Sequence, residues 1–401
     1  MAQQVRYTPA TAAEVELIVA EAAADKRGLE VCGGGSKRLL RRPITSTALL
    51  DMSALAGITD YDPDELVVTA LAGTPLVEIE TALAERQQML AFEPFDHGPL
   101  LGAAPGRATL GGIVAANVSG SRRLSIGAAR DHILGFTAVS GRGEALKGGG
   151  AVVKNVTGFD LPKLMAGSWG TLAVLICITM RVLPRPRAET TVLFKGLSDE
   201  AANRLMSAAL ALPAAVAAAA HVPAPGAAAA ATRAVTALRL EGFAPSVEVR
   251  CRELLRALEP LGAGEAIAGE ESRAFWHGVR TLDALPRAGH VLWRISVPPA
   301  CGWQVPSLLA SDCVPYVYDW AGALVWAAVP ENDPHAAGAE IRAIARSLGG
   351  HARLIRAPPA MREALVPADG EQGLKRLAQR LKAAFDPHGI LNPGLDLAAE
   401  A

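Results

Sequence analysis

The sequence predicts an α+β protein of two domains, and three observations lead to this prediction. The chain has 401 residues, which exceeds the usual size of one domain, so two domains with sizeable cores are expected. Short apolar segments punctuated by glycine alternate with segments whose apolar residues recur at helical spacing. At 183–189, LPRPRAE, two prolines among basic residues indicate a linker, after which the composition changes.

The first elements follow from capping residues and periodicity. Thr11 with Glu14 forms a capping box that opens a helix to about Lys26. The segment LEVCGGGSK, 29–37, is predicted as a short strand that ends in three glycines. Short strands are expected in LLDMS, TDYD and LVVTAL. A helix is expected in PLVEIETALAERQQ, because a helix start does not need the N–H that Pro75 lacks.

Between residues 127 and 183, strands punctuated by glycine end in the apolar run LAVLICITM, 172–180. A membrane-spanning helix needs about 20 apolar residues, so this short run is predicted to be a buried strand. The N-terminal sequence MAQQVRYTPA lacks the basic and then apolar pattern of a signal peptide. A cytoplasmic location is therefore expected.

The second half of the chain is rich in alanine from 199 to 240, which favours helix with small-residue packing, or a loose loop. We assign this stretch no function. The segments VEVRCRELLRAL, HVLWRISV and ALVWAAV indicate a second sheet with helices. At 373–394, GLKRLAQRLKAAFDPHGILNPG predicts an amphipathic helix that runs into a Pro/Gly turn.

Charge and cysteine content exclude several classes of function. The formal net charge is -1, so bulk electrostatic attraction to nucleic acid or to an acidic membrane surface has no support. The cysteines are odd in number, scattered, and form no CxxC pair: Cys32, Cys177, Cys251, Cys301 and Cys313. A disulfide framework or an iron–sulfur cluster held by this chain is not expected.

Three loops of small residues point to one long ligand. In CGGGSK, 32–37, glycines that adopt positive φ can direct successive N–H groups to one anion, and Ser36 and Lys37 add a hydroxyl and a charge. For this loop alone, a plain tight turn is the alternative. The loop 106–120, GRATLGGIVAANVSG, holds four glycines in fifteen residues and offers a surface without large side chains. A third loop carries Lys154, Asn155, Thr157 and Asp160 and then GSWGT at 167–171.

The commonest nucleotide motifs do not match these loops. No GxxxxGK[ST] string of a P-loop occurs in the chain. The segment VCGGGSKRLL also lacks the G-x-G-x-x-G spacing of a Rossmann site. The ligand is therefore expected to be held in another way.

Taken in order, the motifs resemble a known family. The series CGGGSK, LLDMS, LAGTPL, GRATLGGIVAANVSG, DHILGFTAVSGRGE and KNVTGFDLPKLMAGSWGTLAVL resembles the FAD-binding domain of the vanillyl-alcohol oxidase (PCMH-type) flavoproteins. FDPHGILNPG, 385–394, resembles the closing motif of their lactate and glycolate oxidising branch. Within this branch, KNVTGFDLPKL and LWRISVPP, 292–299, look most like the smaller flavin-binding (E) subunits of bacterial glycolate oxidases.

The resemblance implies a fold and a cofactor. It implies a two-lobed PCMH-type FAD-binding domain over 1–186, an α+β cap domain over 187–360, and a C-terminal segment, 361–401, that returns to the FAD domain. The residues implied to hold the FAD pyrophosphate are Gly33, Gly34, Gly35, Ser36, Thr109, Gly111 and Gly112. Those implied to line the adenosine and ribityl part are Asn117, Gly120, Asp131 and Ile133. Many relatives attach the flavin through a histidine where this chain has Ser36 and Lys37, so a noncovalent flavin is expected.

Oxidation of a 2-hydroxy acid on a flavin needs a hydride acceptor, a cation for the carboxylate and a base for the hydroxyl proton. Arg294 in LWRISV is the candidate cation, and an ordinary solvated or core-edge arginine is the alternative. Weaker candidates for a base or a carboxylate ligand are His277, Arg280, His351, Arg353, Arg356 and His388. Larger relatives carry a histidine-rich metal motif around a GDGN-like string, which is absent here, so no metal site is expected.

Three functions stay open at this point. The first is the FAD-bearing subunit of a complex that oxidises glycolate to glyoxylate. Its implied partners are a larger FAD subunit and an iron–sulfur subunit. Any contact with the inner membrane is implied to be peripheral and to run through these partners. The second is a self-sufficient FAD-dependent oxidoreductase for a D-2-hydroxy acid or a sugar alcohol. The third is a cofactor-free assembly scaffold. The motifs favour the first.

Overall fold

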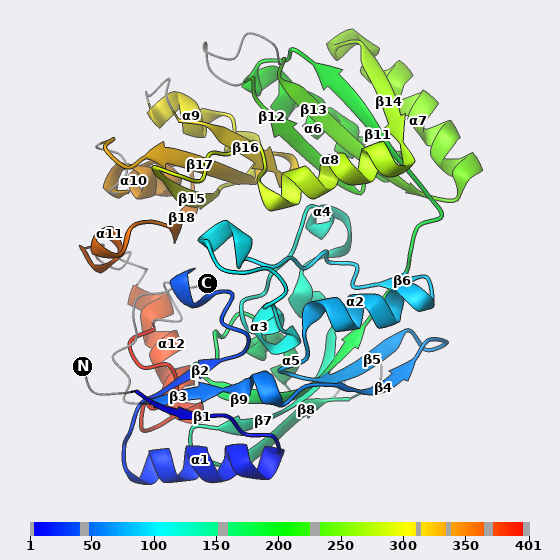
Figure 1. Cartoon of the computed structure of the whole chain (residues 1–401). Coiled ribbons are helices and arrows are strands. Elements are labelled where there is room, and N and C mark those ends of the chain that lie inside the picture. The colour runs from blue at the N-terminus through cyan, green and yellow to red at the C-terminus, as the bar shows by residue number, and fades with distance from the viewer. Residues whose placement is uncertain are drawn as a thin grey trace. The chain divides into compact units, whose positions relative to one another are not determined.

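The chain forms two compact units in the computed structural model (Figure 1). The structure describes residues 4–40, 48–150, 159–224, 233–309, 314–333, 338–364 and 372–395. The first unit comprises 1–119, 127–185 and 366–401, and the second comprises 120–126 and 186–365. The short segment 120–126 thus belongs to the second unit although both of its flanks belong to the first. The domain boundaries expected from the sequence, 1–186 and 187–360, place this segment in the first domain instead.

Two sheets build the first unit, in agreement with the two lobes expected from the sequence. A parallel sheet has the order β1-β3-β2, with β1 Val5–Tyr7, β3 Ala48–Asp51 and β2 Leu29–Cys32. An antiparallel sheet has the order β4-β5-β9-β7-β8, with β4 Ile58–Asp62, β5 Val67–Leu71, β9 Ala173–Arg181, β7 Ile133–Ser140 and β8 Ala145–Gly149. A short pair joins β6 Gln88–Met89 to β10 Leu183–Pro184. The helices are α1 Ala12–Ala24, α2 Leu76–Glu85, α3 Leu110–Ala115, α5 Leu161–Met165 and α12 Gln372–Phe385.

Strand β9 lies in the core of this unit, which confirms the prediction of a buried strand. On one side Leu175 and Ile178 pack in a cluster with residues of α2 and α3. On the other side Val174 and Ile176 pack in a cluster with α1, β2 and β3. A strand covered on both faces reads as a continuous apolar run, which explains why the sequence shows no alternation here.

Local signals placed the first helices correctly. Thr11 caps α1, and its side chain accepts a hydrogen bond from the Glu14 backbone N–H at 3.2 Å. Pro75 occupies the cap position of α2. Helix α5 was not predicted; it begins at a cap, Asp160, whose carboxylate accepts from the Lys163 N–H at 3.3 Å.

The second unit is an eight-stranded antiparallel sheet of order β14-β11-β13-β12-β16-β17-β15-β18. Its strands are β11 Ala188–Lys195, β12 Ala218–Val222, β13 Val235–Gly242, β14 Gly264–Ala268, β15 His290–Ser296, β16 Tyr316–Asp319, β17 Leu324–Pro330 and β18 His351–Arg356. Its helices are α4 Arg123–Ile126, α6 Asp199–Ala211, α7 Ala244–Leu258, α8 Gly269–Thr281, α9 Gln304–Leu309, α10 Ala339–Ser347 and α11 Pro359–Ala364. None of the helices in the described part of the chain is long and apolar enough to cross a membrane.

The alanine-rich region corrects one expectation. Residues 199–211 are helical as α6, but Ala218–Val222 form β12, an inner strand of the sheet, and not a helix or a loop. Ala219 packs in a cluster with residues of α6 and α7, whereas Ala218 and Ala220 contact a cluster containing residues of α8. Small side chains on both faces let helices approach the sheet closely, and this tertiary packing overrides the helix preference of alanine. The stretch GAAAAAT, 226–232, lies outside the described residues.

A network of buried charges attaches the segment 120–126 to the sheet. Arg122 Nε donates to Glu241 Oε2 at 2.9 Å, and Glu241 Oε1 lies 2.8 Å from Arg239 Nε. Arg239 Nη2 also donates to Glu189 Oε2 at 2.6 Å. Each of these four side chains is at most 10% exposed. Two arginines and two glutamates together carry no net charge. The attraction between the opposite charges offsets the cost of removing them from water.

We expect Glu241→Gln to lower the free energy of unfolding of this unit by about 3 kcal/mol, because two buried arginines lose their shared carboxylate. The measurement is the urea midpoint followed by circular dichroism. Glu253→Gln, at an exposed position of α7, is the matched control and should leave the midpoint unchanged. Equal midpoints for the two variants would contradict a structural role for the network.

Candidate functional site

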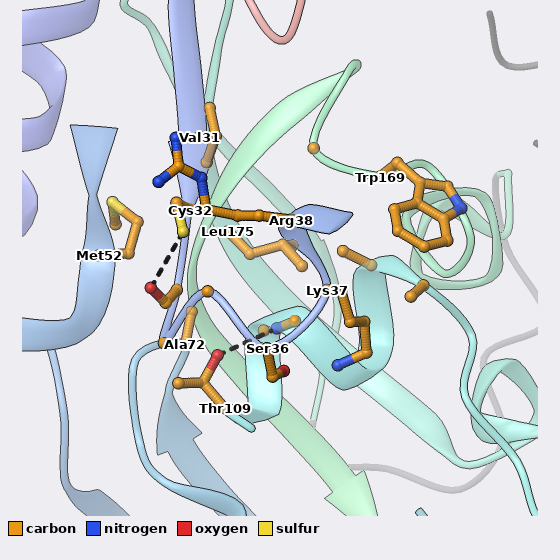
Figure 2. A pocket seen from close by; sticks show the side chains of 18 of the residues that line it. Val31, Cys32, Ser36, Lys37, Arg38, Met52, Ala72, Thr109, Trp169 and Leu175 are labelled. Atoms are coloured by element: carbon orange, nitrogen blue, oxygen red, sulfur yellow. Dashed lines mark hydrogen bonds between the residues drawn. The ribbon is translucent and has the colours of Figure 1, made fainter. Parts of the chain in front are cut away.

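A pocket in the first unit lies where loops from both lobes meet (Figure 2). It encloses about 720 Å³ including its open mouth. The lining residues are Val31, Cys32, Gly33, Gly34, Gly35, Ser36, Lys37, Arg38, Met52, Ala72, Thr109, Gly111, Gly112, Ala115, Ala116, Trp169, Gly170, Ala173 and Leu175. The three small-residue loops therefore contribute to one pocket, as the sequence predicted.

Three of the glycines are required by contact between the loops themselves. A Cβ on Gly34 would lie 1.8 Å from the Arg107 carbonyl oxygen, and one on Gly33 would lie 2.3 Å from Thr109 Oγ1. A Cβ on Gly111 would lie 2.8 Å from the Cβ of Ala72. The two glycine loops are thus held in near contact, and any larger residue would push them apart.

Gly112 has a different environment. A Cβ added there would meet Thr109 Oγ1 at 3.2 Å and Lys37 Nζ at 3.8 Å, with no backbone in the way. Its N–H donates to Thr109 Oγ1 at 3.3 Å, in the cap of α3. Gly112 therefore leaves space between two polar groups that face the pocket.

Lys37 is the one charged pocket residue that the structure leaves without a hydrogen-bond partner among the described residues. The residue is 8% exposed and its Nζ is buried. Burial lowers the pKa of Lys37 to about 8, against the opposing influence of Asp96 and Cys32. Figure 2 shows its side chain beside Ser36 and Thr109, on the far side of the pocket from Met52. A buried ammonium at a cradle of this kind fits a phosphate, which would supply the missing counter-charge.

The C-terminal segment fixes the loops of the pocket. Asn392 Oδ1 accepts from the Val31 N–H at 2.8 Å, and Asn392 Nδ2 donates to the Trp169 carbonyl at 2.7 Å. Lys382 Nζ donates to the Thr171 carbonyl at 2.7 Å and to the Leu391 carbonyl at 2.6 Å. The motif at 385–394 thus clamps the first and third loops, and it lies in the first unit.

The residues proposed for the pyrophosphate and those proposed for the rest of the cofactor differ in position. Gly33, Gly34, Gly35, Ser36, Thr109, Gly111 and Gly112 all line the pocket, whereas Asn117, Gly120, Asp131 and Ile133 do not. Asn117, with φ +48°, accepts from the Arg130 N–H at 3.0 Å, and Asp131 accepts from the Ala128 N–H at 2.8 Å. Ile133 is buried in the core, and Gly120 belongs to the second unit. Lys154, Asn155 and Thr157 lie outside the described residues.

Sequence reasoning missed part of the lining. Met52 directly follows β3, Ala72 directly follows β5 and Leu175 lies in β9, and their types are those of any core residue. Only their position in or next to strands that end at the loops could have indicated them. Trp169 and Gly170 belong to the predicted third loop, GSWGT.

Arg294 lies in the second unit, on β15, over the ring of Trp320. Of the weaker candidates, His351 and Arg353 lie on β18, which pairs with β15, while His277 is on α8. In the described ranges, no three potential metal ligands lie close together.

Comparisons with known proteins agree with the pocket and the fold. A family model described as an FAD binding domain matches residues 4–149. Glycolate oxidase subunit GlcE of Escherichia coli (strain K12) is 37% identical over 380 residues, covering 94% of each chain. D-2-hydroxyglutarate dehydrogenase of Xanthomonas citri pv. viticola is 31% identical over 187 residues, 46% of this chain and 38% of that protein.

Among solved structures, 4-ethylphenol oxidase from Gulosibacter chungangensis matches with a TM-score of 0.72 over 98% of this chain and 89% of that one. The sequence identity is 16%, so this likeness concerns the fold. The fold class predicted from the sequence, a PCMH-type FAD-binding domain with an α+β cap, is confirmed. The pocket, the family model and the full-length relative agree, and the chain belongs to the FAD-binding family of glycolate oxidase subunit GlcE.

Proposed function

We propose that this protein is the FAD-binding subunit of a glycolate oxidase complex, which oxidises glycolate to glyoxylate and passes the electrons on through flavin. The observation that carries the proposal is the match to GlcE over 94% of both chains. As a subunit it would act with partners, for which we propose a larger FAD subunit and an iron–sulfur subunit. We propose a cytoplasmic location, with any contact to the inner membrane made through those partners.

When bound, FAD supplies the acceptor for the hydride that leaves the hydroxyl-bearing carbon. This chain's residues bind and orient it. We assign the pyrophosphate to the cradle formed by the first glycine loop, Ser36, Thr109 and the 111–112 backbone, with Lys37 as its buried counter-charge. Asn117, Gly120, Asp131 and Ile133 remain proposals for the adenosine and ribityl part.

The attachment is proposed to be noncovalent, because Ser36 and Lys37 stand where many relatives carry the linking histidine. No metal is proposed to take part in this subunit. The self-sufficient dehydrogenase is the alternative, and it differs from the main proposal in what the isolated chain can do.

We expect the purified chain to be yellow and to release its flavin into the supernatant on acid precipitation. Its turnover of glycolate with an artificial acceptor dye should be weak or absent until the partner subunits are present. A general base contributes about 10²–10⁴ in rate, and this chain lacks the metal-histidine motif of larger relatives. Robust turnover by the single chain would favour the self-sufficient enzyme, and a colourless chain unable to take up FAD would favour a scaffold.

The affinity for FAD should fall as pH rises above about 8. Lys37 is charged below its lowered pKa of about 8, and a bound anion favours the charged form. Above that pH, binding must take up a proton, so the affinity decreases by up to about tenfold per pH unit. Fluorescence titration of the apoprotein between pH 7 and 9.5 measures this.

Lys37→Met should bind FAD more weakly at pH 7 and lose the pH dependence, whereas Lys37→Arg should keep its affinity to the highest pH, because arginine does not titrate there. A wild-type profile identical to that of Lys37→Met would refute the role of Lys37.

We expect Gly112→Val to abolish flavin binding with little effect on the apo fold. The added side chain would occupy the space between Thr109 Oγ1 and Lys37 Nζ, where no backbone opposes it. Flavin occupancy is read from the visible spectrum and folding from circular dichroism. Gly373→Val, at a position open to solvent on α12, is the control. Equal flavin occupancy in the two variants would contradict the assignment.

A further inference from the structure

An ion pair joins the two ends of the first glycine loop, 32–37. Glu30 lies on β2, just before the loop, and Arg38 follows Lys37, the last residue of the loop. Arg38 Nε donates to Glu30 Oε1 at 2.7 Å, and Arg38 Nη2 donates to Glu30 Oε2 at 2.6 Å. Two parallel hydrogen bonds between a guanidinium and a carboxylate make a strong contact of fixed geometry. The pair therefore fixes the end of the loop relative to the strand from which the loop starts.

The two partners of this pair differ in exposure. The side chain of Glu30 is 6% exposed and that of Arg38 is 44% exposed. Glu30 does not line the flavin pocket, whereas Arg38 does. The hydrogen bond to Glu30 raises the pKa of Arg38 above its ordinary value, against the effect of burial. The guanidinium therefore stays charged over the whole range in which Lys37 titrates. A buried carboxylate outside the lining thus holds a cation that belongs to the lining.

The Arg38 side chain directs its charge away from Lys37. Its Cδ lies 3.7 Å from the place that a Cβ on Gly35 would occupy, so its methylene groups lie against the loop. Figure 2 shows its guanidinium beside Val31 on the strand, whereas Lys37 extends in another direction. Glu30 thus engages the charge of Arg38 and leaves Lys37 as the cation that faces the cradle.

The loop between the two partners consists largely of residues without conformational preference. Glycine has the most backbone freedom to lose, and three successive glycines stand at 33–35. Gly35 has a φ of +79°, in the left-handed region, and its carbonyl oxygen accepts from the Arg38 N–H at 3.2 Å. This turn fixes the backbone of Arg38, and the pair with Glu30 fixes its side chain. A loop closed in this way has lost much of its freedom before a ligand arrives, which lowers the entropic cost of binding.

A separate contact holds the middle of the loop. Arg107 Nε donates to the Gly34 carbonyl oxygen at 2.7 Å and so attaches one backbone group to the second glycine loop. This contact does not join the start of the first loop to its end. The pair of Glu30 and Arg38 does, and it therefore controls where Lys37, which lies between the two partners in the chain, enters the cradle.

We propose that Glu30 is a positioning residue for FAD. By holding Arg38 it closes the first glycine loop in the shape that receives the pyrophosphate, and it keeps the Arg38 charge turned away from Lys37. Its effect on the cofactor passes through Arg38 and the loop backbone, because Glu30 itself does not line the pocket. The proposal rests on the assignment of the pyrophosphate to this cradle, which is part of the proposed function.

Fluorescence titration and stopped-flow mixing of the apoprotein with FAD test this role. Glu30→Gln should weaken FAD binding about tenfold, mainly through a smaller association rate constant, because the ligand must then order the loop. The freed guanidinium is partly exposed and can turn to water, so the fold should persist, and circular dichroism checks it. Glu21→Gln, at an exposed position of α1, is the matched control and should bind FAD as the wild type does.

The partner residue and the pH profile separate positioning from a general loss of structure. Arg38→Met should have the same effect as Glu30→Gln, and the double variant should be no weaker than either, because the two residues act as one unit. Arg38→Lys keeps the charge but not the paired hydrogen bonds, so it should retain only part of the affinity. In Glu30→Gln the affinity should still fall above a pH of about 8, because Lys37 is intact.

A wild-type association rate in folded Glu30→Gln, or losses that add in the double variant, would overturn the proposal. If Glu30→Gln does not fold, Arg38→Lys decides, since it keeps both charges: slower association supports positioning and an unchanged rate refutes it. The outcome is distinct from that of the proposed function. Slower FAD association in Glu30→Gln, in a chain whose complex does not oxidise glycolate, refutes the function alone. Glycolate oxidation with unchanged FAD binding in Glu30→Gln refutes the role of Glu30 alone.

Discussion

The near contact between two backbone loops is the constraint on which the first unit depends. Gly34 lies against the Arg107 carbonyl and Gly33 against Thr109, at distances that leave no room for a Cβ. Because the loops come from different lobes, this contact fixes the distance between the lobes at the mouth of the pocket. Lys37 ends the same loop, and its Nζ is buried without a hydrogen-bond partner among the described residues. A negatively charged ligand offsets the free-energy cost of burying the Lys37 ammonium. The cradle therefore favours a phosphate.

Sequence reasoning reached the fold and most of the pocket because the relevant signals are local. The turn glycines, the capping residue Thr11 and the apolar run of β9 each predict the local structure from a few neighbouring residues. The cradle glycines were found by their density, but the reason for three of them was different from the expected one. Gly33, Gly34 and Gly111 accommodate protein atoms, and Gly112 is the glycine that leaves space.

What the sequence could not provide depends on contacts between distant segments. Ala218–Val222 is a strand because helices pack on both sides of it, and the sequence AAAHV does not by itself indicate that packing. Asn392 acts on Val31 and Trp169 across 361 and 223 positions of the chain. The segment 120–126 carries the adjacent arginines Arg122 and Arg123, which look alike in sequence. Only the folded sheet shows that one faces glutamates and the other an indole shared with Arg294.

The clamp made by Asn392 and Lys382 has a consequence for how the protein is made. A ribosome completes both lobes of the first unit, and then the whole of 186–365, before it releases the residues that tie the pocket loops together. Until then the first loop has its strand pairing but lacks the side chain that joins it to the third loop. Flavin capture is therefore expected only after residues 382–392 have been synthesised. A nascent or prematurely terminated chain would present an open, unfilled cradle to the quality-control machinery of the cell.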